Sequence, residues 1–315
     1  NNYEYIYTSS DNNKNICNIR PISRSYFKIY EILKNYKILN KNDICCCICE
    51  GPGGFIQCLN DHYDINNIFG ITLIDQKNND IPYWNKKILQ KENIKIFFSK
   101  DGTSNIYKIE NSESFINMIL KISGKVEMVT SDGGFDYSND YNNQEESSYQ
   151  LLFCEIYICL HIQKLEGDFI IKFFDLFSYK TIQLLYLLYN CYSEIIIYKP
   201  SFSRLSNSEK YIICRGFKGI DKTILELLKT NYNNFENIYI NIPEKFIILV
   251  NEYNKNYINN QYLEIKKIIE NIKNGKISNK PSKKQVNSAI QWCKLHDLPI
   301  NQNCIYLNNK ISLIN

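Results

Sequence analysis

The sequence predicts an α/β protein whose sheet is mostly parallel, ends in an antiparallel hairpin and is followed by a mainly helical C-terminal extension. Short apolar runs typical of strands alternate with stretches whose apolar residues recur at helical spacing. Only Pro200 to Ser208 separate the last two runs, so these runs are expected to pair directly as a hairpin. The 315 residues suffice for one large domain with an extension or for two modest domains. Because the pattern changes near residue 220, we place the domain at 1–220 and the extension at 221–315.

The strands and helices of the first domain are expected to alternate along most of its length. Strands are predicted near 44–49, 68–74, 94–98, 126–131, 168–174, 194–199 and 210–215, and helices at 24–37, 54–62, 112–121, 147–164 and 179–190. The helix at 147–164 places Leu151, Cys154, Ile158 and Ile162 opposite Gln150 and Gln163. Such alternation gives a parallel sheet covered on both faces, so ligands are expected outside the carboxyl ends of the strands.

Four segments of the extension look helical, at 222–231, 243–252, 256–274 and 284–296. Between the last two, Ile272 to Lys284 carries five lysines together with Gly275 and Pro281, a composition typical of a flexible basic linker. Either a solvated loop or a contact with RNA phosphate is compatible with this stretch.

Charge and hydropathy restrict the class of protein only loosely. The net charge of +4 permits a nucleic-acid partner without requiring one. No apolar stretch reaches the roughly 20 residues that a membrane span needs, and the polar start Asn1 to Glu4 does not resemble a signal peptide. We therefore expect no membrane association.

The twelve cysteines are expected to be buried thiols. Four of them, Cys45, Cys46, Cys47 and Cys49, lie in one apolar run whose alternate side chains point to opposite faces. Only three histidines exist, and no second CxxC pair completes a zinc set, so no metal is expected. Unpaired thiols indicate an intracellular, reducing compartment. The cytoplasm (a viral factory, if the source is viral) and the nucleus both remain open.

Four charged residues occupy segments that are otherwise apolar or aromatic. They are Lys28, Asp132, Lys172 and Glu209. Burying an unpaired charge is costly, so such residues usually pair with one another or mark a site. Two lysines and two carboxylates near the ends of parallel strands are expected to form one compensated cluster.

A glycine-rich loop follows the first predicted strand and opens a helix. Its sequence, Glu50-Gly51-Pro52-Gly53-Gly54-Phe55, matches neither the dinucleotide fingerprint nor the P-loop. Glycines at this place allow a sharp turn and a close approach of the backbone to a ligand. An acidic residue before a compact glycine cluster suits the amino-acid end of S-adenosylmethionine, which carries no phosphate.

Five motifs in order resemble the FtsJ-like (RrmJ-type) ribose 2′-O-methyltransferases, whose sheets also end in an antiparallel hairpin. These are Ser23-Arg24-Ser25-Tyr26-Phe27-Lys28, Glu50 to Phe55, Ser131-Asp132-Gly133-Gly134-Phe135, Lys172-Phe173-Phe174-Asp175-Leu176-Phe177, and Lys199-Pro200 through Ser203-Arg204 to Asn207-Ser208-Glu209-Lys210-Tyr211. The resemblance covers roughly residues 20–220 and is strongest to the cap-specific mRNA branch. It implies a Rossmann-like, S-adenosylmethionine-dependent methyltransferase domain.

The resemblance also implies roles for individual residues. Lys28, Asp132, Lys172 and Glu209 match the family's Lys-Asp-Lys-Glu catalytic set, with Lys172 as the expected proton acceptor. Positions that hold S-adenosylmethionine are matched by Ser23, Gly51, Pro52, Gly53, Gly54, Phe55, Asn105, Ile106 and Asp132, and positions that contact capped RNA by Asn142, Asn143, Gln144 and Asn207. Asn105 departs from the family's usual Asp, which suggests weaker cofactor binding.

The expected activity is methyl transfer to a ribose 2′-hydroxyl near the 5′ cap of mRNA. Burial and the nearby Lys28 favour a lower pKa of Lys172, whereas Asp132 orients Lys172 and opposes that shift, so the sequence leaves the pKa of Lys172 open. A ribosomal or transfer RNA methyltransferase and a catalytically silent RNA-binding scaffold are the alternatives. Any of the aromatic residues Tyr26, Phe27, Tyr83, Trp84 and Phe135 could stack on a cap guanine, although core packing suits each one better.

Overall fold

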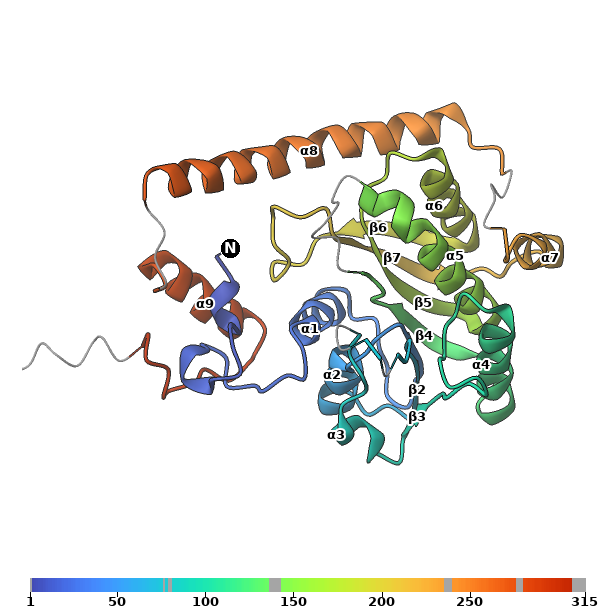
Figure 1. Cartoon of the computed structure of the whole chain (residues 1–315), viewed down its shortest axis with the longest axis horizontal. Coiled ribbons are helices and arrows are strands. Elements are labelled where there is room, and N and C mark those ends of the chain that lie inside the picture. Colours follow the sequence, from blue (N-terminus) through green and yellow to red (C-terminus); the bar gives the residue numbers. More distant parts are fainter. Residues whose placement is uncertain are drawn as a thin grey trace, which may run out of the picture.

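A seven-stranded sheet with the order β3-β2-β1-β4-β5-β7-β6 forms the centre of the molecule (Figure 1). The computed structural model describes residues 2–75, 77–78, 81–135, 143–234, 240–275 and 280–307. The strands are β1 (Ile44–Ile48), β2 (Asn67–Ile71), β3 (Ile94–Ile96), β4 (Val126–Ser131), β5 (Gln163–Phe173), β6 (Tyr192–Tyr198) and β7 (Lys210–Phe217). Strands β1 to β5 pair in parallel, whereas β7 runs antiparallel to both β5 and β6. The predicted parallel sheet with an antiparallel last hairpin is confirmed.

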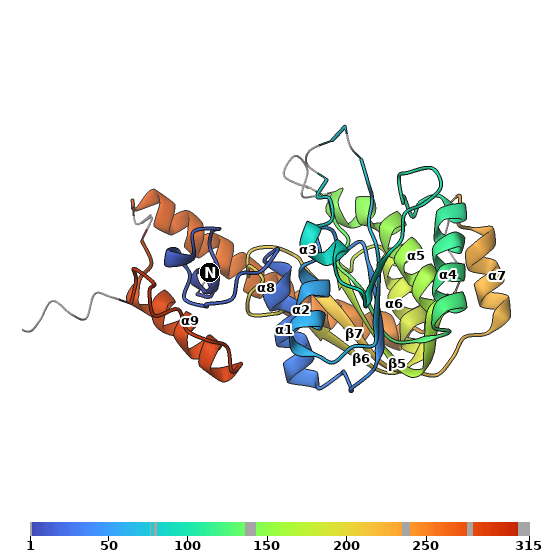
Figure 2. The same ribbon diagram turned by 90° about the horizontal axis from the view of Figure 1, so that it is seen from below.

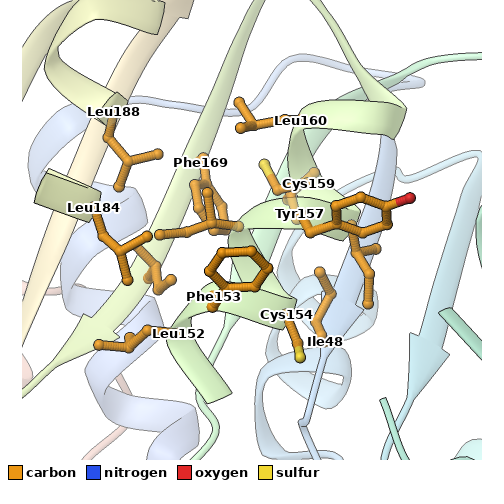
Figure 3. Packing of buried hydrophobic residues seen from close by; sticks show 14 of the residues in the cluster. Ile48, Leu152, Phe153, Cys154, Tyr157, Cys159, Leu160, Phe169, Leu184 and Leu188 are labelled. Carbon is orange, nitrogen blue, oxygen red and sulfur yellow. The ribbon is translucent and has the colours of Figure 1, made fainter. Parts of the chain in front are cut away.

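Helices cover both faces of this sheet (Figures 1 and 2). The domain contains α1 (Ser25–Tyr36), α2 (Gly54–His62), α3 (Lys86–Leu89), α4 (Ile109–Ile122), α5 (Gln144–Ile162) and α6 (Tyr179–Cys191), and two short 3₁₀ turns, Glu4–Ile6 and Asn12–Lys14, precede them. One apolar cluster joins α4, α5 and α6 to one face, and a second joins α1 and α2 to the other. Figure 3 shows the first, where Phe153 and Tyr157 of α5 lie beside Ile48 and Phe169 of the sheet.

Successive cysteine side chains of β1 point to opposite faces of the sheet and so belong to different apolar clusters. Cys46 belongs to the cluster under α4 to α6, whereas Cys45 and Cys47 belong to the cluster under α1 and α2. All twelve cysteines are free, and all are buried except Cys49, which is half-buried. The expectation of buried core thiols is confirmed.

The boundary between α5 and β5 differs from the prediction. Helix α5 starts at Gln144 and ends at Ile162, so Gln163 and Lys164 begin the strand instead of closing the helix. Gln163 is buried, and its Nε2 donates to Val126 O at 3.2 Å and Glu127 O at 3.0 Å. The side-chain amide thus pairs with backbone of β4, and the residue does not face solvent as its helical position suggested.

The extension contains α7 (Lys222–Thr230), α8 (Glu244–Lys273) and α9 (Lys283–Leu295). The two helices predicted at 243–252 and 256–274 are one continuous helix. The polar residue Asn254 between them is buried and donates to Leu176 O at 2.6 Å, so it is a contact of the helix and not a joint. Both ends of the predicted basic linker are also helical, since Lys273 closes α8 and Ser282 caps α9. Despite its 30 residues, neither α8 nor another helix in the described ranges is apolar enough to cross a membrane.

The order of the strands reverses between β1 and β4. Strand β1 pairs with β2 on one side and with β4 on the other, so the connections leave this point in opposite directions. In sheets of this kind the crevice outside the carboxyl ends at such a point is where ligands bind. The glycine-rich loop follows β1, and Asp132 directly follows β4.

Candidate active site

The sheet brings the four predicted charged residues together at its carboxyl edge. Asp132 directly follows β4, and Lys172 lies near the end of the neighbouring strand β5. Ser131 pairs with Ile171, so the next residues of the two segments, Asp132 and Lys172, lie beside each other. Glu209 directly precedes β7, whose Tyr211 pairs with Lys172. Lys28 reaches the cluster from α1.

Two ion pairs compensate the four charges. Lys172 Nζ lies 3.2 Å from Asp132 Oδ1, and Lys28 Nζ lies 2.8 Å from Glu209 Oε2. The four side chains are between 10% and 17% exposed, so the ion pairs are largely shielded from solvent but remain partly accessible to it. The predicted compensated cluster therefore exists as two adjacent pairs.

Further hydrogen bonds fix the orientation of both carboxylates. Tyr211 donates its hydroxyl to Asp132 Oδ1 at 2.7 Å, and Ser203 donates to Glu209 Oε1 at 2.6 Å. Lys172 also donates to the main-chain oxygen of Asp132 at 2.7 Å. A Cβ at Gly134 would lie 3.0 Å from Lys172 Nζ, so glycine leaves room for the lysine.

The carboxylates around Lys172 raise its pKa. Burial lowers the pKa of Lys172, but the charges of Asp132, Glu209 and Glu155 outweigh burial and raise it above its ordinary value. The sequence left the direction of this shift open, and the structure decides it because Lys28 is paired with Glu209 and carboxylates surround Lys172. Burial raises the pKa of Glu209, but Lys28 and Lys172 overcome this and lower it to about 2, so Glu209 is ionised at neutral pH.

Two fully enclosed acids lie behind the cluster. Glu50 accepts from Thr130 Oγ1 at 3.2 Å, and burial raises its pKa well above the ordinary value. Glu155 accepts from the Gly133 N–H at 3.2 Å, and burial raises its pKa to about 8. Sequence reasoning missed Glu155, although it interrupts an apolar stretch of α5 just as Lys172 interrupts one in β5. The same signal would have found it.

A first cavity of about 480 Å³ lies outside β1 and β4. Four of the predicted cofactor residues line it, Gly51, Asn105, Ile106 and Asp132. The prediction did not include the other lining residues, which are Cys49, Thr72, Leu73, Asn78, Ile81, Pro82, Ser104, Tyr107, Gly133, Gly134, Phe135 and Leu151. Many follow the ends of β1, β2 and β4, a position that could have indicated them.

The remaining predicted cofactor residues shape the glycine-rich loop and are not in the wall of this cavity. Gly53 has φ 112°, a conformation that favours glycine, and it precedes α2. A Cβ on Gly54 would collide with the hydroxyls of Ser23 and Ser25, which lie 2.6 Å apart. Phe55 is fully buried. Pro52 also belongs to the loop, and its carbonyl accepts from the Asn85 N–H at 3.1 Å.

A second cavity of about 760 Å³ adjoins the first. Lys172, Glu209, Gln144 and Asn207 line it, and Gly134 and Phe135 belong to the walls of both cavities. Because Asp132 faces the first cavity and Lys172 the second, their ion pair lies at the junction.

The residues predicted to contact RNA are placed unevenly around the second cavity. Gln144 accepts from Ser208 Oγ at 2.8 Å, and Asn207 Oδ1 accepts from Lys199 Nζ at 2.9 Å. Asn143 is exposed at the start of α5, whereas Asn142 lies outside the described residues.

The predicted aromatic residues divide into two groups. Tyr26, Phe27 and Trp84 are at most 2% exposed and belong to the core. Tyr83 and Phe135 are 53% and 47% exposed. Phe135 alone of the five lines both cavities, so it is the one best placed to meet a ligand.

Sequence reasoning also missed the surroundings of two further lysines. Lys199 donates to Asn207 O at 2.9 Å, to Glu209 O at 2.6 Å and to the Tyr257 hydroxyl at 2.8 Å. Burial, opposed in part by Glu209, lowers the pKa of Lys199 to about 7. Lys210 donates to Phe174 O, and burial lowers its pKa to about 8.

The described residues offer no alternative centre built on a metal. Within these ranges no group of three or more His, Cys, Asp or Glu side chains is arranged to hold a metal ion. The charged cluster at the junction of the two cavities is the candidate active site.

Comparison with known proteins agrees with this geometry. The sequence profile of FtsJ-like methyltransferases matches residues 21–217, which is most of the chain and includes all four charged residues. The chain belongs to the FtsJ-like methyltransferase family. The matched region contains the whole sheet, whereas α7, α8 and α9 of this FtsJ-like chain lie beyond it.

Several curated relatives are named cap-specific mRNA (nucleoside-2′-O-)-methyltransferase 1. The protein from Xenopus laevis is 35% identical over 192 residues, which is 58% of this chain and 22% of the relative. The Homo sapiens protein is 35% identical over 182 residues, 55% of this chain and 21% of the relative. The Trypanosoma brucei brucei protein is 33% identical over 190 residues, 59% of this chain and 50% of the relative. The chain thus spans half or less of the length of these relatives.

Among solved structures, a Plasmodium falciparum protein assigned as a ribosomal RNA methyltransferase is similar to this FtsJ-like chain. It is 21% identical, with a TM-score of 0.46, and covers 63% of this chain and 99% of its own.

Proposed function

We propose that this protein transfers a methyl group from S-adenosylmethionine to a ribose 2′-hydroxyl near the 5′ cap of mRNA. The observation that carries the proposal is the position of the Lys172–Asp132 pair. It lies between a cavity sized for a small cofactor and a larger cavity open to a substrate. Methyl transfer needs this arrangement, because donor and acceptor must meet within about 3–3.5 Å.

The residues around the first cavity fit S-adenosylmethionine. Leu73, Ile106 and Leu151 give apolar walls suited to an adenine ring, and the Asn105 amide can hydrogen-bond with it. The carboxylate of Asp132 favours a ligand that carries positive charge. When bound, S-adenosylmethionine would supply a methyl group on a cationic sulfur; a hydroxyl oxygen would bond to the methyl carbon in line, and the sulfur would leave as a neutral thioether.

Lys172 is placed to hold that hydroxyl. Its ammonium has three donors, and two are engaged by the side chain and the main-chain oxygen of Asp132. The third can point a hydroxyl oxygen towards the first cavity. Glu209 remains ionised and binds Lys28, so it keeps the opposite wall of the cluster in place.

Lys172 is also our proposed acceptor for the hydroxyl proton. In the resting arrangement its raised pKa keeps it protonated, so it must first release the proton of this third N–H group to solvent, which leaves a lone pair there to accept the hydroxyl proton. Asp132 is the carboxylate that raises this pKa most strongly. Any positive charge that a ligand brings to Asp132 therefore lowers the pKa of Lys172 towards the range in which it can accept a proton.

The preference for capped mRNA is supported by the names of the relatives and by the motifs around Lys172 and Glu209. Relatives between 33% and 35% identical to this chain are named as cap-specific enzymes. A reducing compartment inside the cell is part of the same proposal, because all twelve cysteines are free.

A methylation assay with matched RNAs tests the proposal. The chain is incubated with S-adenosylmethionine labelled in the methyl group and with one short RNA in capped and uncapped form. We expect label on the capped RNA only, and mass mapping should place it on a ribose 2′-oxygen. Capped RNA already methylated at the first two transcribed riboses is the control and should accept none.

The other outcomes decide between the alternatives. Equal labelling of capped and uncapped RNA would overturn the cap assignment and favour a ribosomal or transfer RNA substrate. Binding of RNA without any labelling would indicate a silent scaffold.

A further inference from the structure

Helix α8 of the extension passes along the second cavity, which Lys172 and Glu209 line. Figure 1 shows it passing above the loop that joins β6 and β7, the segment that contains Lys199 to Glu209. It lies outside the region matched by the family, so neither the resemblance nor the relatives give it a role.

The start of α8 is fixed on the methyltransferase domain. The Phe246 ring packs edge-on against Tyr186 of α6 at 4.9 Å. The buried Asn254 donates to Leu176 O at 2.6 Å. These contacts hold the first half of the helix against α6 and so set the direction in which the rest extends.

Tyr257 of α8 contacts the segment that carries Glu209. Its hydroxyl accepts from Lys199 Nζ at 2.8 Å and lies 3.1 Å from Asn207 O and 3.3 Å from Glu209 O. Its ring lies 4.4 Å from the ammonium of Lys210. One side chain of the extension thus joins the residues immediately around Glu209.

One turn further on, α8 forms part of the second cavity. Gln261 donates to Ser206 O at 3.0 Å, and both Gln261 and Ile265 line the cavity together with Lys172 and Glu209. Ile265 is 38% exposed, so its apolar surface is available to a ligand.

The chemistry of this wall suits a nucleotide. Ile265 offers an apolar surface for a base or ribose, and the Gln261 amide can form hydrogen bonds with polar edges. Arg204, in the wall of the same cavity, is 65% exposed at its side chain and can meet a phosphate. Apolar, amide and guanidinium groups beside the charged cluster together match the parts of an RNA strand.

We propose that α8 forms one wall of the RNA site, with Ile265 and Gln261 contacting the nucleotide next to the reactive ribose and Tyr257 positioning Glu209. The inference rests on the proposed methyltransferase function. It assigns recognition of the substrate in part to the extension, whereas the catalytic set belongs to the domain matched by the family.

Substitutions on two sides of α8 test the wall. Ile265→Glu places a negative charge in the cavity, and we expect the KM for capped RNA to rise about tenfold with little change in kcat. Leu263→Glu is the matched control, since Leu263 is 61% exposed on the same helix and does not line the cavity. Ile265→Ala, which removes surface without adding charge, should give a smaller increase.

Tyr257→Phe tests the positioning role. It removes only the hydroxyl that contacts Lys199 and the carbonyl oxygens of Asn207 and Glu209. We expect kcat to fall about tenfold while the KM for RNA stays close to the wild-type value, the opposite division from Ile265→Glu. Thermal unfolding measures the fraction of folded protein. If activity falls only in proportion to that fraction, Tyr257 has a structural role alone.

Direct binding separates failure of this inference from failure of the proposed function. Fluorescence anisotropy with labelled capped RNA measures affinity even if the wild-type chain transfers no methyl group. Weaker binding by Ile265→Glu than by Leu263→Glu supports the wall in either case. Equal affinity and equal KM for the two variants would overturn it, whatever the activity of the wild type.

Discussion

Two lysines near the second cavity, Lys172 and Lys199, have different partners. Lys172 is buried more deeply than Lys199, yet its pKa is raised, whereas that of Lys199 is lowered to about 7. Carboxylates surround Lys172, and its nearest one, Asp132, lies 3.2 Å away. Lys199 is held by neutral oxygens of Asn207, Glu209 and Tyr257. The charge of the partners, more than the depth of burial, therefore sets the direction in which the pKa of each lysine is shifted.

The largest effect is expected from Lys172→Ala. Removing the proposed proton acceptor should lower methyl transfer by about 10³-fold while S-adenosylmethionine still binds, since Lys172 does not line the first cavity. Single-turnover transfer and cofactor titration measure the two effects. Lys164→Ala is the matched control, because Lys164 lies on the same strand, 55% exposed, and pairs with Glu127. A fully active Lys172→Ala would remove Lys172 from the chemistry.

An intermediate effect is expected from Lys199→Met, on stability and its dependence on pH. The pKa of Lys199 is about 7 in the folded protein and about 10.4 in the unfolded chain, so between these values the unfolded chain holds the extra proton. Wild-type stability should therefore gain about 2 kcal/mol from pH 7 to pH 9 through this residue, and the variant should lack that gain. Urea unfolding at both pH values measures the difference.

The control for that experiment is Lys164→Met. The carboxylate of Glu127 raises the pKa of Lys164, so its charge does not change between pH 7 and pH 9. Its difference from wild type should be the same at both values. If Lys199→Met behaves in the same way, the contrast between the two lysine regions is wrong.

The smallest effect is expected from Asn105→Asp, which replaces a neutral side-chain amide in the first cavity by a carboxylate. The two lysines differ in the same way, since Lys199 has neutral partners and Lys172 has a carboxylate. Asn105 Oδ1 accepts from the Tyr107 N–H at 2.9 Å, and an aspartate can keep that bond. The added charge should tighten S-adenosylmethionine binding about threefold, measured by titration calorimetry. Asn105→Ala should weaken it, and unchanged affinity in both variants would show that this side chain does not contact the cofactor.

The sheet and the charged cluster were predictable because their signals are local. Apolar runs give the strands, and a parallel sheet brings the segments after them to one edge, so Asp132 and Lys172 were expected at the same edge. The pairing of β4 with β5 makes them neighbours there. The pKa direction of Lys172 was not predictable, because it depends on how Lys28 and Glu155 are oriented in the folded chain. The contact of Lys199 with Tyr257 spans 58 residues and forms only when α8 docks, which no local pattern indicates.

Helix α8 is anchored on the sheet through its first half, and the chain after it is anchored again through α9. Its 30 residues span about 45 Å, and only Val250 and Asn254 are buried, both in its first half. Beyond its far end the chain continues into α9, whose Trp292 donates to Glu31 of α1 at 3.1 Å, and Cys17 near one terminus bridges to Ile300 near the other. The second half of α8, which includes Gln261 and Ile265, therefore has no buried residue. The residues of α8 that line the second cavity can therefore vary without disturbing the sheet. Such variation would let related chains change their RNA preference while the chemistry stays the same.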